Sequence, residues 1–407
     1  MQTKVRKILF ALIFIVPLCA IFIPARKAGA DSVLGSGHFG IPVLPADARS
    51  RAIGGASVAL PGEVFSFTNP ARTINFRRSG FNGVIAQDYR TVKGPYSTDK
   101  LRSTEFLAFR AVFPTAKRFV VSWGIFQSRD LEWVADDRID LPFSTGELQR
   151  YYSSDGGIYV SRIGVARTLS PHLAVGLGLD WTLGKTRQRR NLNFGAAEYL
   201  NSTELFSYEY SCFRPTFGVL TGYRRFSLGF ALTIPKTCTI DKQSTFSSGY
   251  TAKEIIGVDF PVALRIGTAL NVSPRGLIAA DLEFEEWSNL KGTLDPRLSP
   301  ANQWRFCLGY ELLPASGDQR AFYRKVPLRV GYSRSAYPFK IDGEPVGEQL
   351  FSFGTGLYFG QGGGLMDLAF EIGKRKAIAP GLPDESLFRV IVSLSAFERW
   401  VSKPRRK

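Results

Sequence analysis

Most of the chain after residue 78 is a series of runs about ten residues long in which apolar and polar residues alternate. In the clearest run, Leu177, Leu179 and Trp181 alternate with Gly178 and Asp180. A period of two is the pattern of a β-strand that is apolar on one side. Fourteen such runs begin near Gly80, Thr104, Phe119, Gly157, His172, Phe206, Phe226, Ile255, Gly276, Asn302, Val326, Gln349, Gly364 and Ser386. The fourth and sixth runs alternate least clearly.

The connections between these runs alternate as well. Most even-numbered runs are followed by a short turn, as at 114–117, 170–171, 221–222, 273–274 and 360–363. Odd-numbered runs are followed by longer, more polar loops, as at 130–156, 188–205, 236–253, 288–301 and 335–348. An even number of strands with short turns at one end and long loops at the other is typical of a bacterial outer-membrane barrel.

The predicted fold is therefore all-β, a 14-stranded antiparallel transmembrane β-barrel over residues 79–397. A closed sheet leaves no backbone group unpaired in lipid, so the apolar faces would point at lipid and the polar faces would line the lumen. The abundance of Phe (32) and Gly (40) at a mean hydropathy of −0.03 fits strands that are apolar on one side only. The alternative is a secreted, soluble propeller or pair of sandwiches, whose apolar faces pack inward. That alternative gives no reason for the alternation of short turns and long loops.

Residues 1–30 have the three parts of a secretory signal peptide. Lys4, Arg6 and Lys7 precede an apolar core at 8–23, and Ala28-Gly29-Ala30 offers a cleavage site. An uncleaved anchor is the alternative, because the apolar core is rather long. We expect export to the bacterial outer membrane with cleavage near Ala30.

The formal net charge of +17 falls to about +12 after cleavage, because five basic residues and no acidic one precede the cleavage site. A nucleic-acid partner is not expected, since the Lys and Arg residues are spread over turns and strands rather than gathered on one helix. We expect instead that the basic residues contact anionic outer-membrane lipid or form a basic surface with no specific partner. Residues 398–407 end in a basic run that we interpret as a solvated tail.

Residues 31–78 do not alternate well enough to form wall strands. They are rich in Gly and Pro, which favours a compact, turn-rich segment. A barrel of fourteen strands has a lumen too wide for the wall side chains to fill. We therefore predict that residues 31–78 form a plug inside the barrel.

The residues of this segment resemble a known family. The run from Ala52 to Ala59, AIGGASVA, followed by Asn69-Pro70-Ala71, resembles the N-terminal hatch of the FadL-like outer-membrane transporters of long-chain fatty acids and other hydrophobic compounds. PorV-type barrels, which are associated with secretion, share this pattern. The resemblance implies a hatch that rearranges to let a hydrophobic ligand pass. The residues that it implies for the hatch and for ligand gating are Gly54, Gly55, Phe65, Phe67, Asn69, Pro70 and Ala71.

The sequence gives little support for catalysis, and we predict no enzyme, no cofactor and no metal site. The two histidines, His38 and His172, lie too far apart in the predicted fold to serve one site. The lumen-facing carboxylates Asp281, Glu283 and Glu285 could bind a cation, but a solvated barrel interior is the better explanation and needs no function for them.

Cysteine is sparse in the exported part of the chain, and no CxxC motif is present. Cys212 and Cys238 would lie near each other if the sixth and seventh runs pair, and the sequence leaves open whether they form a disulfide. Neither a metal site nor a disulfide scaffold is predicted from this pattern.

The predicted function is transport of a hydrophobic small molecule across the outer membrane, with a long-chain fatty acid as the default ligand. An alternative is a PorV-like barrel that binds a secreted partner protein. A further alternative is a scaffold or pore with no specific ligand. The sequence does not identify the ligand, the direction of flux or the oligomeric state.

Overall fold

The computed structural model describes residues 40–94, 98–115, 119–140, 147–195, 200–289, 298–314, 326–359, 363–377 and 384–398. The predicted signal peptide (1–30), His38 and residues 399–407 of the predicted tail lie outside these ranges.

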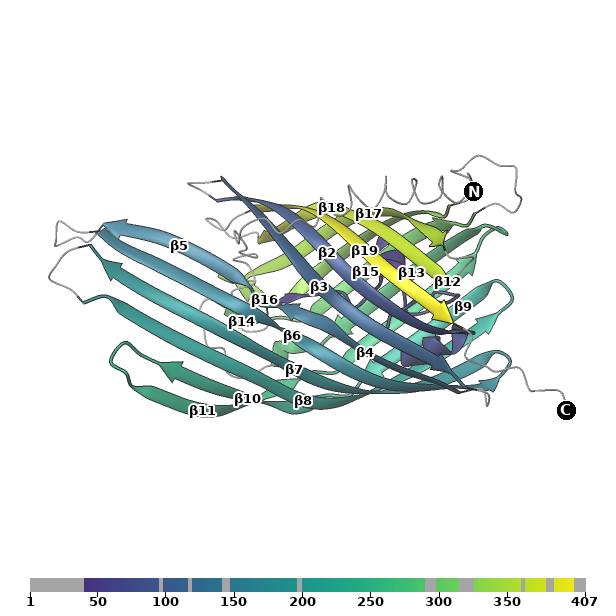
Figure 1. Cartoon of the computed structure of the whole chain (residues 1–407), viewed down its shortest axis with the longest axis horizontal. Helices are drawn as coiled ribbons and strands as arrows, with labels where there is room; N and C mark the ends of the chain where they lie inside the picture. The colour runs from purple at the N-terminus through teal and green to yellow at the C-terminus, as the bar shows by residue number, and fades with distance from the viewer. Residues whose placement is uncertain are drawn as a thin grey trace, which may run out of the picture.

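The wall is a single antiparallel sheet that closes on itself (Figure 1). Its strands are β2 (Ser79–Lys93), β3 (Thr98–Pro114), β4 (Phe119–Asp130) with β5 (Trp133–Asp140), β6 (Glu147–Ser170), β7 (Leu173–Phe194), β8 (Ser202–Tyr223), β9 (Phe226–Thr233) with β10 (Lys236–Thr245), β11 (Thr251–Phe260) with β12 (Ala263–Asn271), β13 (Gly276–Glu285), β14 (Leu298–Pro300) with β15 (Gln303–Leu312), β16 (Leu328–Ile341), β17 (Glu344–Phe359), β18 (Gly364–Ala377) and β19 (Asp384–Glu398). The four joined pairs each form one wall strand, which gives fourteen. Pairing of β19 with β2, from Glu398↔Ser79 to Asp384↔Lys93, closes the barrel.

The prediction of a fourteen-stranded barrel is confirmed, and each predicted run corresponds to one wall strand. The two runs that alternate least clearly are β6 and β8, which have 24 and 22 residues. The apolar and polar faces of the strands also point in the predicted directions. On β7, Leu177 and Trp181 are 50% and 45% exposed, whereas Asp180 is 6% exposed. The apolar faces therefore point outward to lipid, and the soluble alternative is wrong.

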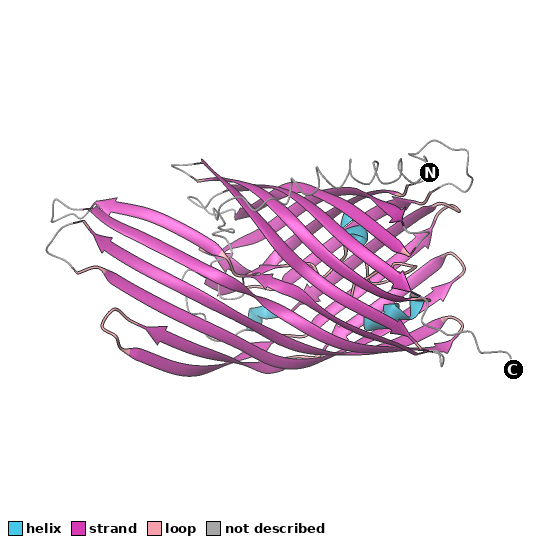
Figure 2. Cartoon of the chain, in the orientation of Figure 1, coloured by secondary structure: helices cyan, strands magenta, loops and turns pink. Residues whose placement is uncertain are grey.

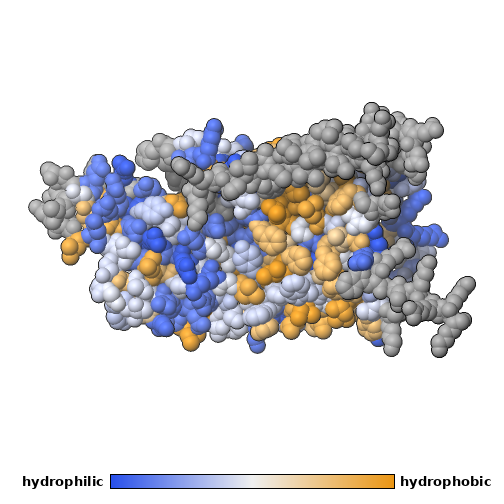
Figure 3. Space-filling view, in the orientation of Figure 1, coloured by the Kyte–Doolittle hydropathy of each residue, from blue (hydrophilic) through white to orange (hydrophobic). Residues whose placement is uncertain are grey.

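One side of the barrel continues far past the other (Figure 1, left). We call this part the projection, made of β5, β10, most of β11 and the parts of β6, β7 and β8 near residues 147–156, 185–194 and 202–211. The prediction of loops at 188–205 and 236–253 is wrong for most of their residues, because these are paired strands. Alternation is less clear there because the outward face carries many polar residues, as Figure 3 shows in blue over this end, with orange gathered over the barrel. Backbone pairing between neighbouring strands continues through the projection.

The loop predicted at 335–348 is also wrong. β16 and β17 continue to a tight turn at Asp342 and Gly343, both of which have positive φ (51° and 83°). This is the two-residue hairpin geometry that Asp-Gly favours. The pairing across the turn joins Ile341 to Glu344.

Helices are few and short within the described ranges (Figure 2). They are α2 (Ala48–Ala52), η2 (Pro70–Asn75) and η3 (Trp287–Asn289). Across the described ranges, no helix has the length and apolar character needed to cross a membrane.

We call residues 40–78 the N-terminal segment, which lies inside the barrel and bonds to wall strands on several sides. Ala48 N–H donates to Ser393 Oγ of β19, and Ser57 N–H donates to Asp281 Oδ2 of β13. Asn69 Nδ2 donates to the carbonyl oxygen of Val219 in β8. A short strand, β1 (Ile41–Pro42), pairs with β4. The largest apolar core of the molecule lies between this segment and the wall.

Candidate functional site

The helix α2 begins in the middle of the N-terminal segment. Asp47 caps it, because its Oδ1 accepts a hydrogen bond from Ser50 N–H, as is usual at helix N-termini. The other carboxylate oxygen accepts from Phe65 N–H, which joins the two halves of the segment. A single buried carboxylate therefore fixes both the helix and the chain that returns past it.

Gly54 and Gly55 follow α2 and have φ values of +74° and +95°, which side chains disfavour. A Cβ on Gly54 would lie 2.5 Å from the carbonyl oxygen of Tyr332 in β16. The same close contact is found from the wall side, since a Cβ on Gly331 would lie 2.0 Å from Gly54 N. Gly54 is thus one of the places where the segment backbone contacts the wall backbone. Inward-facing Gly331 is the matching wall residue, and sequence reasoning did not single it out.

Phe65 and Phe67 are 1% and 2% exposed and belong to the core cluster against β2, β3, β4 and β19. The rings of Phe65 and Phe76 lie edge to face with centroids 4.7 Å apart. The guanidinium of Arg110 lies 5.7 Å from the Phe67 ring centroid. Both phenylalanines pack the segment against the wall.

Asn69, Pro70 and Ala71 form the start of η2. Asn69 Oδ1 accepts from Ala71 N–H at 3.0 Å, and its Nδ2 donates to the carbonyl oxygens of Val58 and Val219. The side chain thus joins two parts of the segment to β8. A Cβ on the wall residue Gly218 would lie 2.2 Å from Asn69 Oδ1.

The seven predicted hatch residues are all buried, but the structure does not gather them into one pocket. They contact three separate parts of the wall: β15 and β16 near Gly54, the β2–β4 and β19 side near Phe65, and β7 and β8 near Asn69. Their common property is close contact with the wall.

Sequence reasoning missed two arginines of α2. Arg49 Nη2 lies 2.6 Å from Glu311 Oε2 of β15, and Arg51 Nη1 lies 3.2 Å from Glu371 Oε2 of β18. Arg389 also binds Glu371, at 3.1 Å, so one buried carboxylate has two cationic partners. Such pairs fix the segment, because removing one partner leaves a buried charge without compensation. The available signal was two arginines in an otherwise apolar stretch.

A cavity of about 80 Å³ lies between the N-terminal segment and inward-facing residues of the wall, and we call it the arginine cavity. Its charged lining residues are Arg129, Arg162, Arg214, Arg265, Arg305, Asp180, Glu283 and Glu285. Five cations against three anions give a surplus of two positive charges. The buried atoms Arg129 Nη1 and Arg265 Nε have no hydrogen-bond partner within the described part of the chain. Two unused donors and a charge surplus make this cavity suited to an anionic group.

The carboxylates that the sequence suggested for a cation have other partners. Asp281 accepts hydrogen bonds from Ser57 N–H and Val58 N–H of the segment, so it anchors the segment. Glu285 lies 3.0 Å from Arg129 Nη2 and accepts a hydrogen bond from Trp287 Nε1. No cluster of metal-ligating residues occurs among the residues that the structure describes.

An apolar group, the mouth cluster, lies at the root of the projection next to the arginine cavity. Its members are Leu131, Ile158, Phe206, Tyr208, Tyr210, Ile240, Ile256 and Val258. Ile158 also lines the arginine cavity, so the two sites are adjacent. Burial raises the pKa of the Tyr208 phenol, in keeping with apolar surroundings. A largely buried apolar cluster thus lies beside a cationic cavity.

Comparison with known proteins identifies the family. The BamG family model matches residues 5–406. The chain belongs to the BamG family. No curated protein matches it.

Several solved structures share the fold of this BamG-family chain. A Pseudomonas aeruginosa FadL homologue covers 89% of this chain with all of its own length, at 14% identity and a TM-score of 0.63. The toluene transporters TodX of Pseudomonas putida and TbuX of Ralstonia pickettii are also 14% identical, with TM-scores of 0.60 and 0.59. They cover 88% and 90% of this chain, each with its full length. At this identity the likeness establishes the FadL-type outer-membrane barrel fold, and not the ligand.

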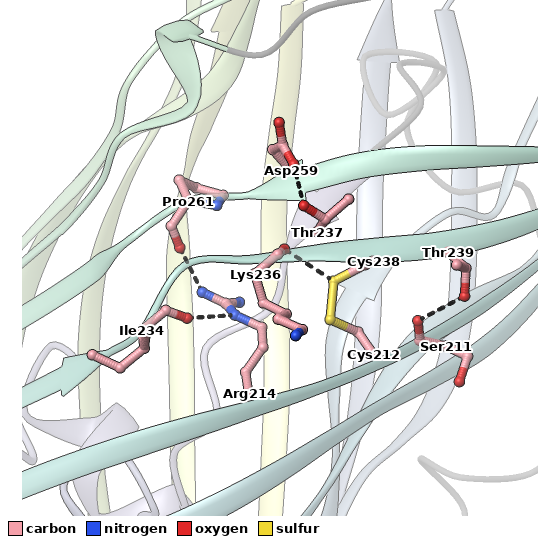
Figure 4. Close-up of a disulfide and its surroundings, with 10 residues drawn as sticks. All are labelled: Ser211, Cys212, Arg214, Ile234, Lys236, Thr237, Cys238, Thr239, Asp259 and Pro261. Atoms are coloured by element: carbon pink, nitrogen blue, oxygen red, sulfur yellow. Dashed lines mark hydrogen bonds between the residues drawn. A yellow bond between two sulfur atoms is a disulfide. The ribbon is translucent and has the colours of Figure 1, made fainter.

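A disulfide between Cys212 and Cys238 joins β8 to β10 at the root of the projection (Figure 4), which settles the pairing that the sequence left open. The ladders are interrupted just beside it, between β9 and β10 and between β11 and β12. Arg214 crosses the interruption and donates to the carbonyl oxygens of Ile234 and Pro261 (Figure 4). The disulfide and the Arg214 side chain together connect neighbouring strands where the ladders are interrupted.

His172 lies at the turn between β6 and β7, where its Nδ1 is 3.0 Å from the carbonyl oxygen of Gly222. Its ring packs edge to face on Tyr223 with centroids 5.4 Å apart. These contacts give the histidine a structural role in the turn.

Proposed function

We propose that this protein passes an apolar compound with an acidic head group across the outer membrane, with a long-chain fatty acid as the default ligand. The observation that carries the proposal is the arginine cavity directly beside the mouth cluster. An apolar tail would pack against the mouth cluster, while a carboxylate would bind Arg129 and Arg265. Both arginines line the cavity, and each has a buried donor without a hydrogen-bond partner in the described part of the chain.

In this mechanism the N-terminal segment acts as a hatch. The arginine cavity is about 80 Å³ and a second cavity beside the segment is about 30 Å³, both well below the roughly 300 Å³ at which ligand pockets begin. A hydrocarbon chain therefore passes only after the segment moves. Binding of the anionic head group would compete for the arginines around Glu283 and Glu285 and loosen the contacts nearby. The names of TodX and TbuX, toluene transporters, support an apolar cargo for this fold.

The proposal is tested with oleic acid and methyl oleate, which have the same tail and differ in charge. We expect the purified protein to retain oleate in native mass spectrometry and to retain methyl oleate at least about fivefold less. Arg265→Met should abolish this preference. Arg187→Met, which removes an exposed arginine of the projection, is the matched control and should preserve it. Equal retention of acid and ester by the wild-type protein would refute the acidic head group.

A second function, docking of a partner protein, is favoured by apolar side chains on the polar projection. Ile255 and Tyr250 are 75% and 65% exposed there. Exposed apolar side chains on a rigid, water-facing sheet are typical of protein interfaces. Native mass spectrometry of protein extracted gently from its own outer membrane separates the two functions. A bound fatty-acid-sized molecule supports transport, whereas a stoichiometric protein that is lost on Ile255→Asp supports docking.

A further inference from the structure

Five adjacent wall strands carry an aligned row of side chains on the outward face of the barrel, away from the lumen. The ladder register gives its order across β3, β2, β19, β18 and β17 as Arg102, Tyr89, Phe388, Ile372 and Phe351. The rings of Tyr89 and Phe388 lie 5.9 Å apart, and Arg102 lies 5.3 Å from the Tyr89 ring centroid. Ile372 and Phe351 are 49% and 66% exposed. This apolar row is continuous with the lipid-facing belt.

The next outward-facing row toward the projecting rim has a different chemistry. The same ladders align, in strand order, Lys100, Thr91, Ser386, Lys374 and Gln349. Side chains of both rows line one groove on the barrel exterior. The two lysines stand three strand spacings apart, roughly 14 Å, so their long side chains can reach a single group between them. Hydroxyl and amide side chains lie between and beside the lysines.

The charges around these rows favour an anion. The two rows contain three cations and no carboxylate. The nearest acidic residue of the following row, Asp384, lies 3.0 Å from Lys376. On the inward face, Asp88 and Glu385 bind lumenal arginines, so their charges are already compensated.

We propose that these two rows form a binding site for one phosphate-bearing lipid of the membrane leaflet that meets the projecting rim. The acyl chains lie on Phe388, Ile372 and Phe351, and the phosphate is bound by Lys100 and Lys374 with hydroxyl donors between them. A lipid fits because the apolar row and the cationic row are stacked in the order of an acyl chain and its head group. A soluble anion would contact only the row that contains Lys100 and Lys374.

The site is tested on the delipidated full-length protein in mild detergent. It is titrated with dioleoyl phosphatidic acid or dioleoylglycerol, which share their acyl chains and differ by the phosphate. Native mass spectrometry counts the bound lipid. We expect phosphatidic acid to bind about tenfold better than dioleoylglycerol, and the Lys100→Ala/Lys374→Ala double variant to lose this advantage. Heat-dependent gel mobility verifies that each variant is folded.

The matched control is Lys185→Ala/Lys253→Ala, which removes two exposed lysines of the projection. It should bind phosphatidic acid as the wild-type protein does. A Lys100→Arg/Lys374→Arg variant keeps both charges and should also bind. Equal binding of the two lipids to the wild-type protein, or an equal loss in the control, would overturn the proposal, since either result means unspecific attraction to a basic surface.

Discussion

The contacts of α2 and the arginine cavity use the same residue type in different ways. Around α2, Arg49 and Arg51 each lie against a wall carboxylate, and the segment backbone contacts the wall at Gly54. In the arginine cavity, five arginines share three carboxylates, so the arginines outnumber their partners. Compensated arginines fix the segment, because a buried charge is stable only when it is paired. Surplus arginines leave binding capacity for an anion.

Breaking the ion pairs of α2 should have the largest effect on stability. Glu371→Gln removes the anion that Arg51 and Arg389 share, and leaves buried cations with one carboxylate fewer. We expect a loss of about 3 kcal/mol in the free energy of unfolding. The measurement is urea unfolding of the protein refolded in detergent, followed by tryptophan fluorescence.

The control for this loss is Glu254→Gln in the projection. Glu254 is 62% exposed and lies 3.3 Å from Lys242, so its pair is exposed to solvent and should contribute less than about 0.5 kcal/mol. If both variants lose the same stability, the buried pairs do not fix the segment. The contrast between the ion pairs of α2 and the arginine cavity then fails.

The wall could be predicted from the sequence because its signal is local. Lipid on one side and polar groups on the other impose a period of two on each strand. The projection could not be predicted in the same way, because its outward face carries many polar residues and lacks the alternation that lipid imposes. The ion pairs of α2 depend on partners 262 and 320 residues away, so no spacing in the sequence reveals them. The resemblance of the Gly54-Gly55 region identified a segment with special contacts, but not Gly331, its wall partner.

A smaller effect is expected where the segment and the wall meet through glycine. Gly331→Ala would bring a Cβ within 2.0 Å of Gly54 N, and backbone shifts must relieve that clash. We expect a loss of about 2 kcal/mol and faster proteolysis of residues 40–78. Gly83→Ala is the matched control on β2, since a Cβ there meets nothing within 4 Å. Equal protease sensitivity of the two variants would show that the contact does not hold the segment.

The smallest loss of stability is expected in the arginine cavity, and it is the most informative test of the difference from α2. Arg265→Met removes one cation, yet Glu285 keeps Arg129 at 3.0 Å and Glu283 keeps Arg305 at 3.9 Å. Since both carboxylates retain a partner, we expect a loss of less than about 1 kcal/mol in the same urea measurement. A loss as large as that of Glu371→Gln would mean that Arg265 is needed to compensate the carboxylates. The cavity would then have no cation to spare for a ligand, and its arginines would serve the same structural purpose as those of α2.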